Sequence, residues 1–160
     1  MRLDEALSGV THLGVDTAPI IYLIEAHPKY DRLMTEVFGH IERGTLTGVT
    51  SVITLSEVLT QPFKTGNTEL QQEYADLLLH SNHFQTVNLN SEMAELAAEL
   101  RARYNLRIPD ALQISAALFT GCEAFLTNDI VLKRVNELRI LLLDDLFIPE
   151  APSRSDETIS

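Results

Sequence analysis

The chain has 160 residues and a formal net charge of −11, from 12 basic and 23 acidic residues. This length is enough for one domain with a hydrophobic core, and an apolar fraction of 45% is ordinary for a globular protein. The acidic balance argues against a reader of duplex DNA, which needs a basic face. It does not exclude a nuclease, because a bound metal ion reverses the local charge and can receive a phosphate directly.

The sequence carries no clear signal for membrane insertion, secretion or disulfide formation. No stretch free of Asp, Glu, Lys and Arg reaches the roughly 18 residues of a membrane-spanning helix. The N-terminus has acidic residues early and lacks the apolar segment of a secretory signal. Cys122 is the lone cysteine, which excludes an internal disulfide and fits a reducing compartment. We therefore expect a cytoplasmic protein that makes no use of a membrane.

Strand and helix signals alternate along the chain. Residues 1–11 are interpreted as a short leader. Strands are predicted over five apolar or alternating segments: 12–16, 45–50, 84–89, 123–127 and 139–145. Helices are predicted from apolar periodicity and from stop signals such as Gly44, Pro62 and Gly121, over residues 17–26, 30–43, 53–60, 70–78, 93–104, 109–120 and 130–136.

This alternation predicts an α/β fold with a largely parallel sheet covered by helices on both faces. We expect a single-domain three-layer sandwich whose mostly parallel sheet has four or five strands. No internal repeat or linker interrupts the chain, so residues 12–147 are assigned to one domain. The composition of residues 148–160 is typical of disorder and predicts a flexible tail.

Four acidic residues stand where a strand gives way to a helix or where a helix opens. They are Asp16 in LGVDTAPIIYLIE, Glu57 in TSVITLSEVL, Asp110 in IPDALQISAAL and Asp129 in FLTNDIVLKRV. The carboxyl ends of parallel strands meet at one edge of a sheet, where ligands bind. Carboxylates gathered there repel one another unless a cation lies between them. Oxygen ligands without a Cys or His cluster suit Mg²⁺ or Mn²⁺.

Each acid also has a purely structural explanation. Asp16 and Asp129 are placed to cap the helices that follow them. Asp110 lies in a first helical turn, where an acid favours the helix dipole. Glu57 completes a capping-box pattern that begins at Thr54. Helix caps accept Ser, Thr or Asn as readily as Asp, however, and a carboxylate is used at all four places, so the joint pattern favours a metal site.

Four segments resemble the motifs of PIN domains, a family of metal-dependent ribonucleases that includes the toxins of type II toxin–antitoxin pairs, the VapC class. The segments VDTAPIIYLIE, TLSEVL, IPDALQISAAL and LTND follow the family order over about residues 12–146. The resemblance implies a Mg²⁺- or Mn²⁺-dependent endoribonuclease with four metal-binding, catalytic acids: Asp16, Glu57, Asp110 and Asp129. It implies supporting polar groups at three further positions: Thr127, Thr17 and Asn128.

Asp16 and Asp110 are assigned as anchoring ligands of the metal, and Glu57 and Asp129 as contributors to the activation of water. Two features depart from the family pattern. Ala18 stands where many members keep a polar residue, and the chain begins about ten residues earlier than compact toxins. Because of Ala18, no extra side-chain hydrogen bond is expected beside Asp16. The longer N-terminal segment counts against the toxin assignment but not against the fold.

The expected partners follow from charge and from the resemblance. We expect an RNA substrate that is single-stranded or looped, because an acidic domain lacks the extended basic surface that grips a duplex. A homodimer and a small antitoxin with a basic tail are also expected. Five basic residues are interpreted either as a guide for the phosphate backbone or as solvated helix ends: Arg101, Arg103, Arg107, Lys133 and Arg134.

Other functions stay open at this point. A PIN nuclease of RNA processing and a non-catalytic, metal-binding interaction domain are both compatible with the four acids. A phosphohydrolase of the haloacid dehalogenase type requires a second Asp two residues after the first, where this chain has Ala18. A receiver domain requires an acidic pair near its first strand, whereas Asp144 and Asp145 lie near the last.

Overall fold

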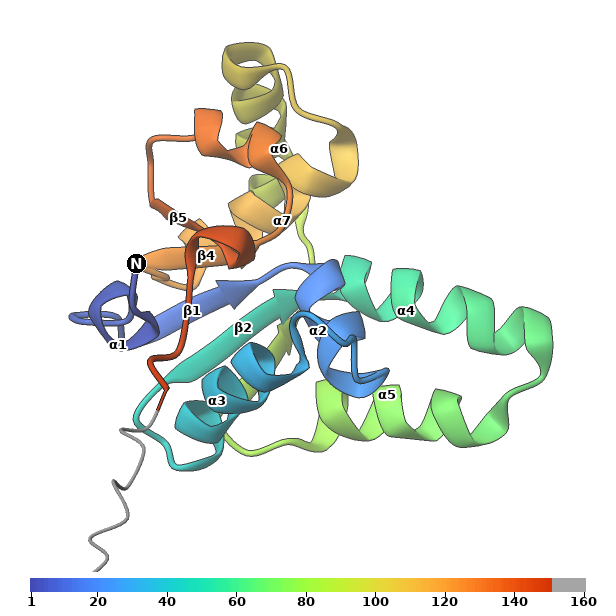
Figure 1. The fold of residues 1–160 in the computed structure, drawn as a ribbon. Coiled ribbons are helices and arrows are strands. Elements are labelled where there is room, and N and C mark those ends of the chain that lie inside the picture. The colour runs from blue at the N-terminus through green and yellow to red at the C-terminus, as the bar shows by residue number, and fades with distance from the viewer. Residues whose placement is uncertain (151–160) are drawn as a thin grey trace, which may run out of the picture.

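The computed structural model describes residues 1–150, so most of the expected tail, residues 151–160, lies outside the described residues. Its middle layer is a five-stranded sheet in the order β3-β2-β1-β4-β5, with every neighbouring pair parallel (Figure 1). The strands are β1 (His12–Val15), β2 (Thr47–Ser51), β3 (Phe84–Val87), β4 (Ala124–Thr127) and β5 (Arg139–Leu142). This is the α/β sandwich that the alternation of elements predicted.

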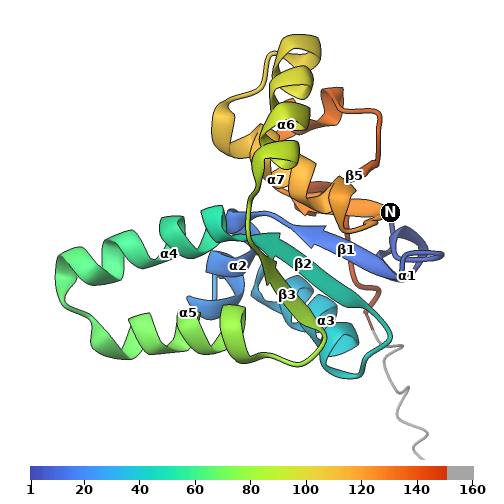
Figure 2. The same cartoon turned by 180° about the vertical axis from the view of Figure 1, so that it is seen from behind.

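Helices precede or join successive strands. The α-helices are α1 (Leu3–Ala6), α2 (Thr17–Ile24), α3 (Asp31–Glu42), α4 (Val52–Thr65), α5 (Thr68–His80), α6 (Ser91–Tyr104) and α7 (Ile108–Phe119). Two short 3₁₀ helices flank the last strand, η1 (Ile130–Arg134) and η2 (Leu143–Asp145). Figures 1 and 2 show α6 and α7 on one face of the sheet and α2 and α3 on the other, with α4 and α5 as a long antiparallel pair. No helix among residues 1–150 is long and apolar enough to cross a membrane.

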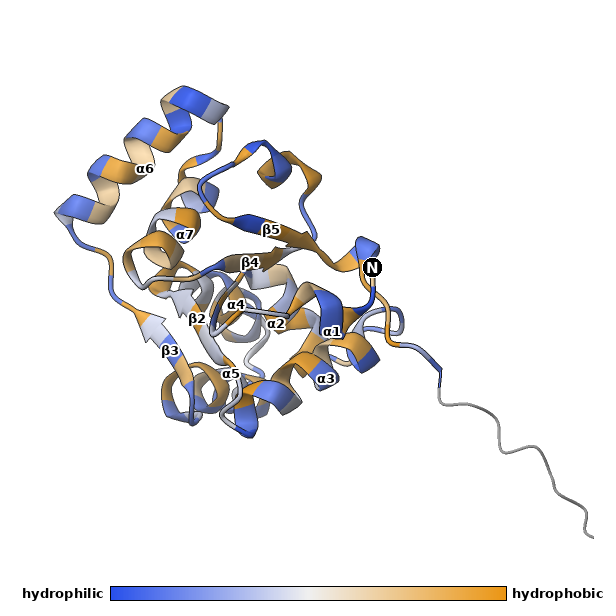
Figure 3. Cartoon of the chain, turned by 90° about the vertical axis from the view of Figure 1, so that its left-hand side faces the viewer, coloured by the Kyte–Doolittle hydropathy of each residue, from blue (hydrophilic) through white to orange (hydrophobic). Residues whose placement is uncertain are grey.

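The sheet separates two hydrophobic cores, because successive side chains of a strand point to opposite faces. Leu13 and Val15 of β1 pack into the core beneath α2 and α3, together with Leu126 of β4. Phe125 of β4 and Val49 of β2 pack into the core beneath α6 and α7. Figure 3 shows β4 and β5 as mostly hydrophobic segments inside the molecule and hydrophilic turns on the outer side of α6. Burial of both sheet faces therefore explains why the interior strands β1 and β4 are largely apolar.

Gly14 allows α7 and β4 to approach the centre of the sheet closely. A Cβ atom at this position would lie 2.6 Å from Cδ2 of Phe125 and 3.0 Å from Cβ of Ala117. The first distance is shorter than real Cβ contacts and the second is unusually tight, so the glycine serves close approach and not a special backbone angle. Gly14 lies two residues before Asp16, and Ala117 belongs to the same helix as Asp110, so this packing joins the two elements that carry these acids.

The prediction that Pro62 ends a helix was wrong. Helix α4 continues to Thr65 and ends at Gly66, which has the left-handed backbone (φ 66°) typical of a helix C-terminus. Proline removes one helical hydrogen bond, but Pro62 is buried where α4 packs against α5, and this packing offsets the loss. Asn67 then caps α5 by accepting a hydrogen bond from the backbone N–H of Leu70 at 3.1 Å.

The segment interpreted as a leader contributes to the core. Leu3, Ala6 and Val10 are buried. The backbone N–H of Leu3 donates to the carbonyl of Phe147 at 2.9 Å, and that of Phe147 donates to Met1 at 3.0 Å. Residues 1–10 therefore pack beside the end of the last strand instead of projecting from the domain.

Candidate metal and catalytic site

A cleft of about 420 Å³ opens at the carboxyl ends of β1 and β4. These neighbouring strands mark the point where the strand order reverses, since β2 and β3 continue on one side of β1 while β4 and β5 lie on the other. Open α/β sheets bind ligands at such a switch point. All four acids singled out from the sequence line this cleft: Asp16, Glu57, Asp110 and Asp129.

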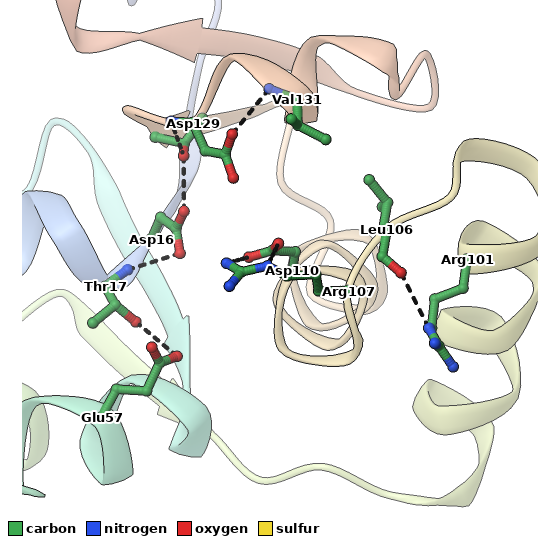
Figure 4. A network of polar contacts seen from close by, with 10 residues as sticks. Asp16, Thr17, Glu57, Arg101, Leu106, Arg107, Asp110, Asp129 and Val131 are labelled. Carbon is green, nitrogen blue, oxygen red and sulfur yellow. Dashed lines mark hydrogen bonds and ion pairs between the residues drawn. The ribbon is translucent and has the colours of Figure 1, made fainter.

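Asp16 is held rigidly at the end of β1. Its backbone N–H donates to the carbonyl of Leu126 at 2.9 Å, which places Asp16 beside the end of β4. Its Oδ1 atom accepts from the backbone N–H of Thr17 at 2.8 Å, and its Oδ2 atom accepts from Oγ1 of Thr127 at 2.7 Å. Asp16 therefore does cap α2, as its structural explanation requires, while its carboxylate also lines the cleft (Figure 4).

The cleft places Asp16 in an unfavourable electrostatic position. Burial, with a smaller contribution from the negative charges of Asp110 and Glu57, raises the pKa of the Asp16 carboxyl to about 6, even though its hydrogen bonds with Thr127 and Thr17 lower it. A carboxylate in this position lacks positive charge around it. A bound cation would supply that charge.

Glu57 cannot act as a helix cap. Helix α4 begins at Val52, and Ser51 caps it by accepting a hydrogen bond from the backbone N–H of Ile53 at 3.2 Å. Glu57 therefore lies beyond the first turn, and the capping-box interpretation was wrong. Its Oε1 atom accepts one long hydrogen bond, 3.3 Å from Oγ1 of Thr17, and the residue is otherwise exposed in the cleft. Glu57 is thus the least constrained of the four acids.

Asp129 and Asp110 approach the cleft from opposite sides. Asp129 caps η1, since its Oδ1 atom accepts from the backbone N–H of Val131 at 3.0 Å. Asp110 lies in the first turn of α7 and is almost fully buried. Its Oδ2 atom forms an ion pair with Nε of Arg107 at 3.1 Å, and a second contact joins Oδ1 to an Nη of Arg107 at 3.5 Å (Figure 4).

A buried polar network beneath the cleft was not predicted. Gln113 of α7 donates from Nε2 to Oγ1 of Thr54 at 2.6 Å and accepts from Oγ of Ser51 at 2.6 Å. Thr54 also lies 3.0 Å from Oγ1 of Thr17, the hydroxyl that reaches Glu57. Thr50 completes the network by donating to Thr54 at 2.8 Å. The signal was present in the sequence, because Gln113 is the one amide in the nearly all-apolar segment IPDALQISAAL.

The supporting residues divide into two kinds. Thr17 and Thr127 are buried and hydrogen-bond the acids directly, as described above. Asn128 lines the cleft, but its amide nitrogen donates to the hydroxyls of Tyr30 at 3.2 Å and Tyr22 at 3.4 Å. The rings of these two tyrosines are stacked, with centroids 4.7 Å apart. Asn128 therefore positions an aromatic pair beside the cleft and does not contact the acids.

The five basic residues considered from the sequence do not act as one group. Arg101 donates to the carbonyl of Leu106 at 3.1 Å, and Arg134 donates to the carbonyl of Tyr104 at 3.3 Å. Arg103 forms an ion pair with Glu137, and Lys133 forms one with Asp145. Only Arg107 of the five lines the cleft. The hydrogen bond with Asp110, followed by the charge of Asp110, raises the pKa of Arg107 above its usual value.

The donor set fits a hard divalent cation. Four carboxylates line one cleft, hydroxyls support two of them, and neither Cys nor His is among the lining residues. Within residues 1–150 no three acidic, His or Cys side chains are already arranged to hold a metal ion. Each acid instead contacts a neighbouring group. Thr127 donates to Asp16 and Thr17 donates to Glu57. The backbone N–H of Val131 donates to Asp129, and Arg107 pairs with Asp110. Metal binding would therefore compete with these contacts.

Comparisons with known proteins agree with this fold. A family model described as the PIN domain matches residues 14–138. The comparison with curated proteins gave no match. A chain of VapBC2 from Rickettsia felis, bound to a DNA fragment from their promoter, is similar with a TM-score of 0.67 at 20% identity, over 82% of this chain and 98% of that chain.

Two further solved structures show the same likeness. VapC20 of Mycobacterium tuberculosis, described as a sarcin-ricin loop cleaving toxin, is similar with a TM-score of 0.61 at 16% identity, over 81% of this chain and 99% of that chain. A toxin–antitoxin complex from Klebsiella pneumoniae is similar with a TM-score of 0.58 at 24% identity, over 74% of this chain and 87% of that chain. At these identities the likeness is one of fold.

Proposed function

Because this chain belongs to the PIN-domain family, we propose that it is a divalent-metal-dependent endoribonuclease that cleaves RNA phosphodiester bonds. The observation that carries this proposal is the meeting of Asp16, Glu57, Asp110 and Asp129 in one cleft at the switch point of the sheet. Helix capping accounts for Asp16 and Asp129 but not for Glu57, which lies beyond the first turn of its helix.

We propose Mg²⁺ or Mn²⁺ as the cofactor. When bound, such an ion supplies a Lewis acid that orients water, lowers its pKa and holds the charge that develops on the phosphate oxygens. Asp16 and Asp110 would hold the ion, because both lie on rigid elements and Asp16 lacks compensating positive charge. The two carboxylates would do so from opposite walls of the cleft, the end of β1 and the start of α7.

Glu57 and Asp129 are proposed to assist the attacking water. Glu57 is exposed in the cleft and accepts a single long hydrogen bond, so its carboxylate is free to accept a proton or to turn toward an ion. Asp129 keeps one oxygen fixed by the N–H of Val131 and leaves the other oxygen for water or metal. Thr127 holds this corner together, since its hydroxyl donates to Asp16 and accepts from the backbone N–H of Asp129 at 3.1 Å.

We further propose that the protein is the toxin of a type II toxin–antitoxin pair and that an antitoxin with a basic tail covers the cleft. The fold is shared with VapC and VapBC structures. The net charge of −11 favours a basic partner. Ile108 and Ile130 directly follow the cleft residues Arg107 and Asp129 and are 54% and 73% exposed, which offers apolar area for a partner or for a homodimer.

The proposed activity is tested with purified protein and a panel of single-stranded and looped RNAs. Cleavage is expected with Mg²⁺ or Mn²⁺, should stop with EDTA, and should return when the metal is added back. Cleavage that continues in EDTA after removal of bound metal, or a lack of cleavage across a broad panel, would contradict the proposal. Native purification followed by mass spectrometry tests the partner: a small basic protein should co-purify, and its release should increase with salt concentration.

A further inference from the structure

Arg107 is the one basic side chain among the described residues that line the cleft. Figure 4 shows its guanidinium beside the Asp110 carboxylate, whereas Arg101, which lies close in sequence, is turned toward Leu106. The side chain of Arg107 is 77% exposed, while that of Asp110 is 11% exposed. The carboxylate is therefore fixed in the wall of the cleft, and the guanidinium reaches it from solvent.

We infer that Arg107 is a mobile counter-charge, which neutralises Asp110 while the cleft holds no metal ion and binds a phosphate oxygen of the RNA once a metal ion has taken Asp110. This inference rests on the proposed metal-dependent ribonuclease function. It assigns to one residue two alternative partners of the same charge, a carboxylate and a phosphate, both of which match the planar fork of a guanidinium.

The geometry supports a contact that can be released. One Arg107–Asp110 contact is 3.1 Å long and the second is 3.5 Å long, so the pair is not a tight two-point fork. Because the guanidinium end of the pair is 77% exposed, solvent screens the contact, and water can replace Asp110 as the partner of Arg107 when the contact breaks. A divalent ion at Asp110 would repel the guanidinium, since both are cations competing for the same carboxylate.

The surroundings of Arg107 favour phosphate as its second partner. The other four basic residues near this edge are each engaged by a carbonyl or a carboxylate away from the cleft, as described above. An acidic cleft repels an RNA backbone until the metal ion and at least one cationic side chain offset its charge. Release of Arg107 by the metal would supply that side chain at the same moment that the ion binds.

The test compares wild-type protein with Arg107→Ala, Arg107→Lys and a control variant, Arg43→Ala, in which an exposed arginine outside the cleft is removed. Mn²⁺ affinity is measured by calorimetry without RNA, and KM and kcat for one cleavable RNA are measured separately. Arg107→Ala should bind Mn²⁺ up to about 5-fold more tightly, because a competing cation has been removed. The same variant should raise KM for RNA by roughly 10-fold or more, because a charge-assisted hydrogen bond is lost.

Arg107→Lys should keep near wild-type Mn²⁺ affinity but recover only part of the RNA binding, because an ammonium lacks the guanidinium fork. Arg43→Ala should match the wild type in both measurements. If Arg107 only supported the fold, its removal would weaken both Mn²⁺ binding and RNA binding. Tighter Mn²⁺ binding together with weaker RNA binding is therefore the diagnostic result. Unchanged or weaker Mn²⁺ binding by Arg107→Ala, or an unchanged KM, would overturn the inference. Wild-type protein that neither binds Mn²⁺ nor cleaves RNA would instead refute the proposed function, and this inference with it.

Discussion

The hydroxyl of Thr127 donates a 2.7 Å hydrogen bond to Oδ2 of Asp16 and so joins the carboxyl ends of two neighbouring strands at the cleft. Thr127 is fully buried, and its Oγ1 atom also accepts from the backbone N–H of Asp129. One neutral side chain thus fixes the relative positions of two acids, Asp16 and Asp129, that follow neighbouring strands. Its removal should change the site without removing a charge.

Thr127→Val should make metal binding more dependent on pH. The hydrogen bond from Thr127 lowers the pKa of Asp16, which is nevertheless about 6, so its loss should raise that pKa further. Because a carboxyl must be deprotonated to bind metal, Mn²⁺ affinity should fall most near neutral pH and recover at higher pH. Calorimetry across this pH range checks the shift, with Thr127→Ser as the control that keeps the hydroxyl. A uniform loss of affinity at all pH values would contradict the assignment.

Asp16→Asn should stabilise the metal-free protein at neutral pH. The folded-state pKa of about 6 lies above the ordinary value of 3.8, so between these pH values the folded protein retains a proton that the unfolded chain has released. Proton binding by Asp16 therefore stabilises the folded protein fully below about pH 4, and this stabilisation is lost as the pH rises through about 6. The loss is at most about 3 kcal/mol of unfolding free energy, because Asp16 is only half-buried. Urea unfolding of metal-free protein should therefore show a pH-dependent loss of stability in the wild type that is smaller in the variant.

Asp110→Asn provides the comparison for that experiment. It should bring a smaller gain, because Arg107 already compensates the charge of Asp110. Both variants should respond less to added Mg²⁺ than the wild type, since ligand stabilisation depends on affinity. A large loss of metal-free stability in both variants would favour the helix-capping explanation over the metal site.

Gln113→Leu should disturb the site through its buried support. The change leaves the hydroxyl of Ser51 without its partner and removes a donor to Thr54, which should cost about 1–3 kcal/mol of unfolding free energy. It should also reduce metal affinity, because Thr17, whose hydroxyl reaches Glu57, would lose the amide donor of Gln113 that lies 3.4 Å away. Ser115→Ala is the matched control, since Ser115 is buried on the same helix but bonds to the carbonyl of Met93 outside the network. Equal metal affinity in the wild type and Gln113→Leu would show that the network serves only stability.

The sequence predicted the fold and the neighbourhood of the four acids because both depend on simple periodicity. Apolar strands that alternate with helices require a covered parallel sheet, and acids that follow strands β1 and β4 then meet at one edge. The strands expected near 12–16 and 123–127 are indeed neighbours. The continuation of α4 past Pro62 was missed, because the packing of α4 against α5 outweighs the local preference of proline.

The contacts within the site were less predictable than its location. Local sequence suggested a capping role for Glu57, but the true start of α4 at Val52 could be identified only from the packed structure. The spacing of Arg107, three residues before Asp110, permits their ion pair, but Arg103 could be excluded from the cleft only once its own partner was known. The difference arises because Glu137, distant in sequence, lies within reach of Arg103 and leaves Arg107 to Asp110.

The central claim is that the four acids work as one site, and the most direct test is the cleavage rate of one defined RNA. Single variants Asp16→Ala, Glu57→Ala, Asp110→Ala and Asp129→Ala are compared with the Glu57→Ala/Asp129→Ala double variant and with Glu99→Ala, an exposed acid on α6. Each single variant should lose most activity, the double variant should lose little more, and Glu99→Ala should match the wild type, because residues of one catalytic unit do not contribute additively. Cleavage that persists in Asp16→Ala at the wild-type rate would contradict the account.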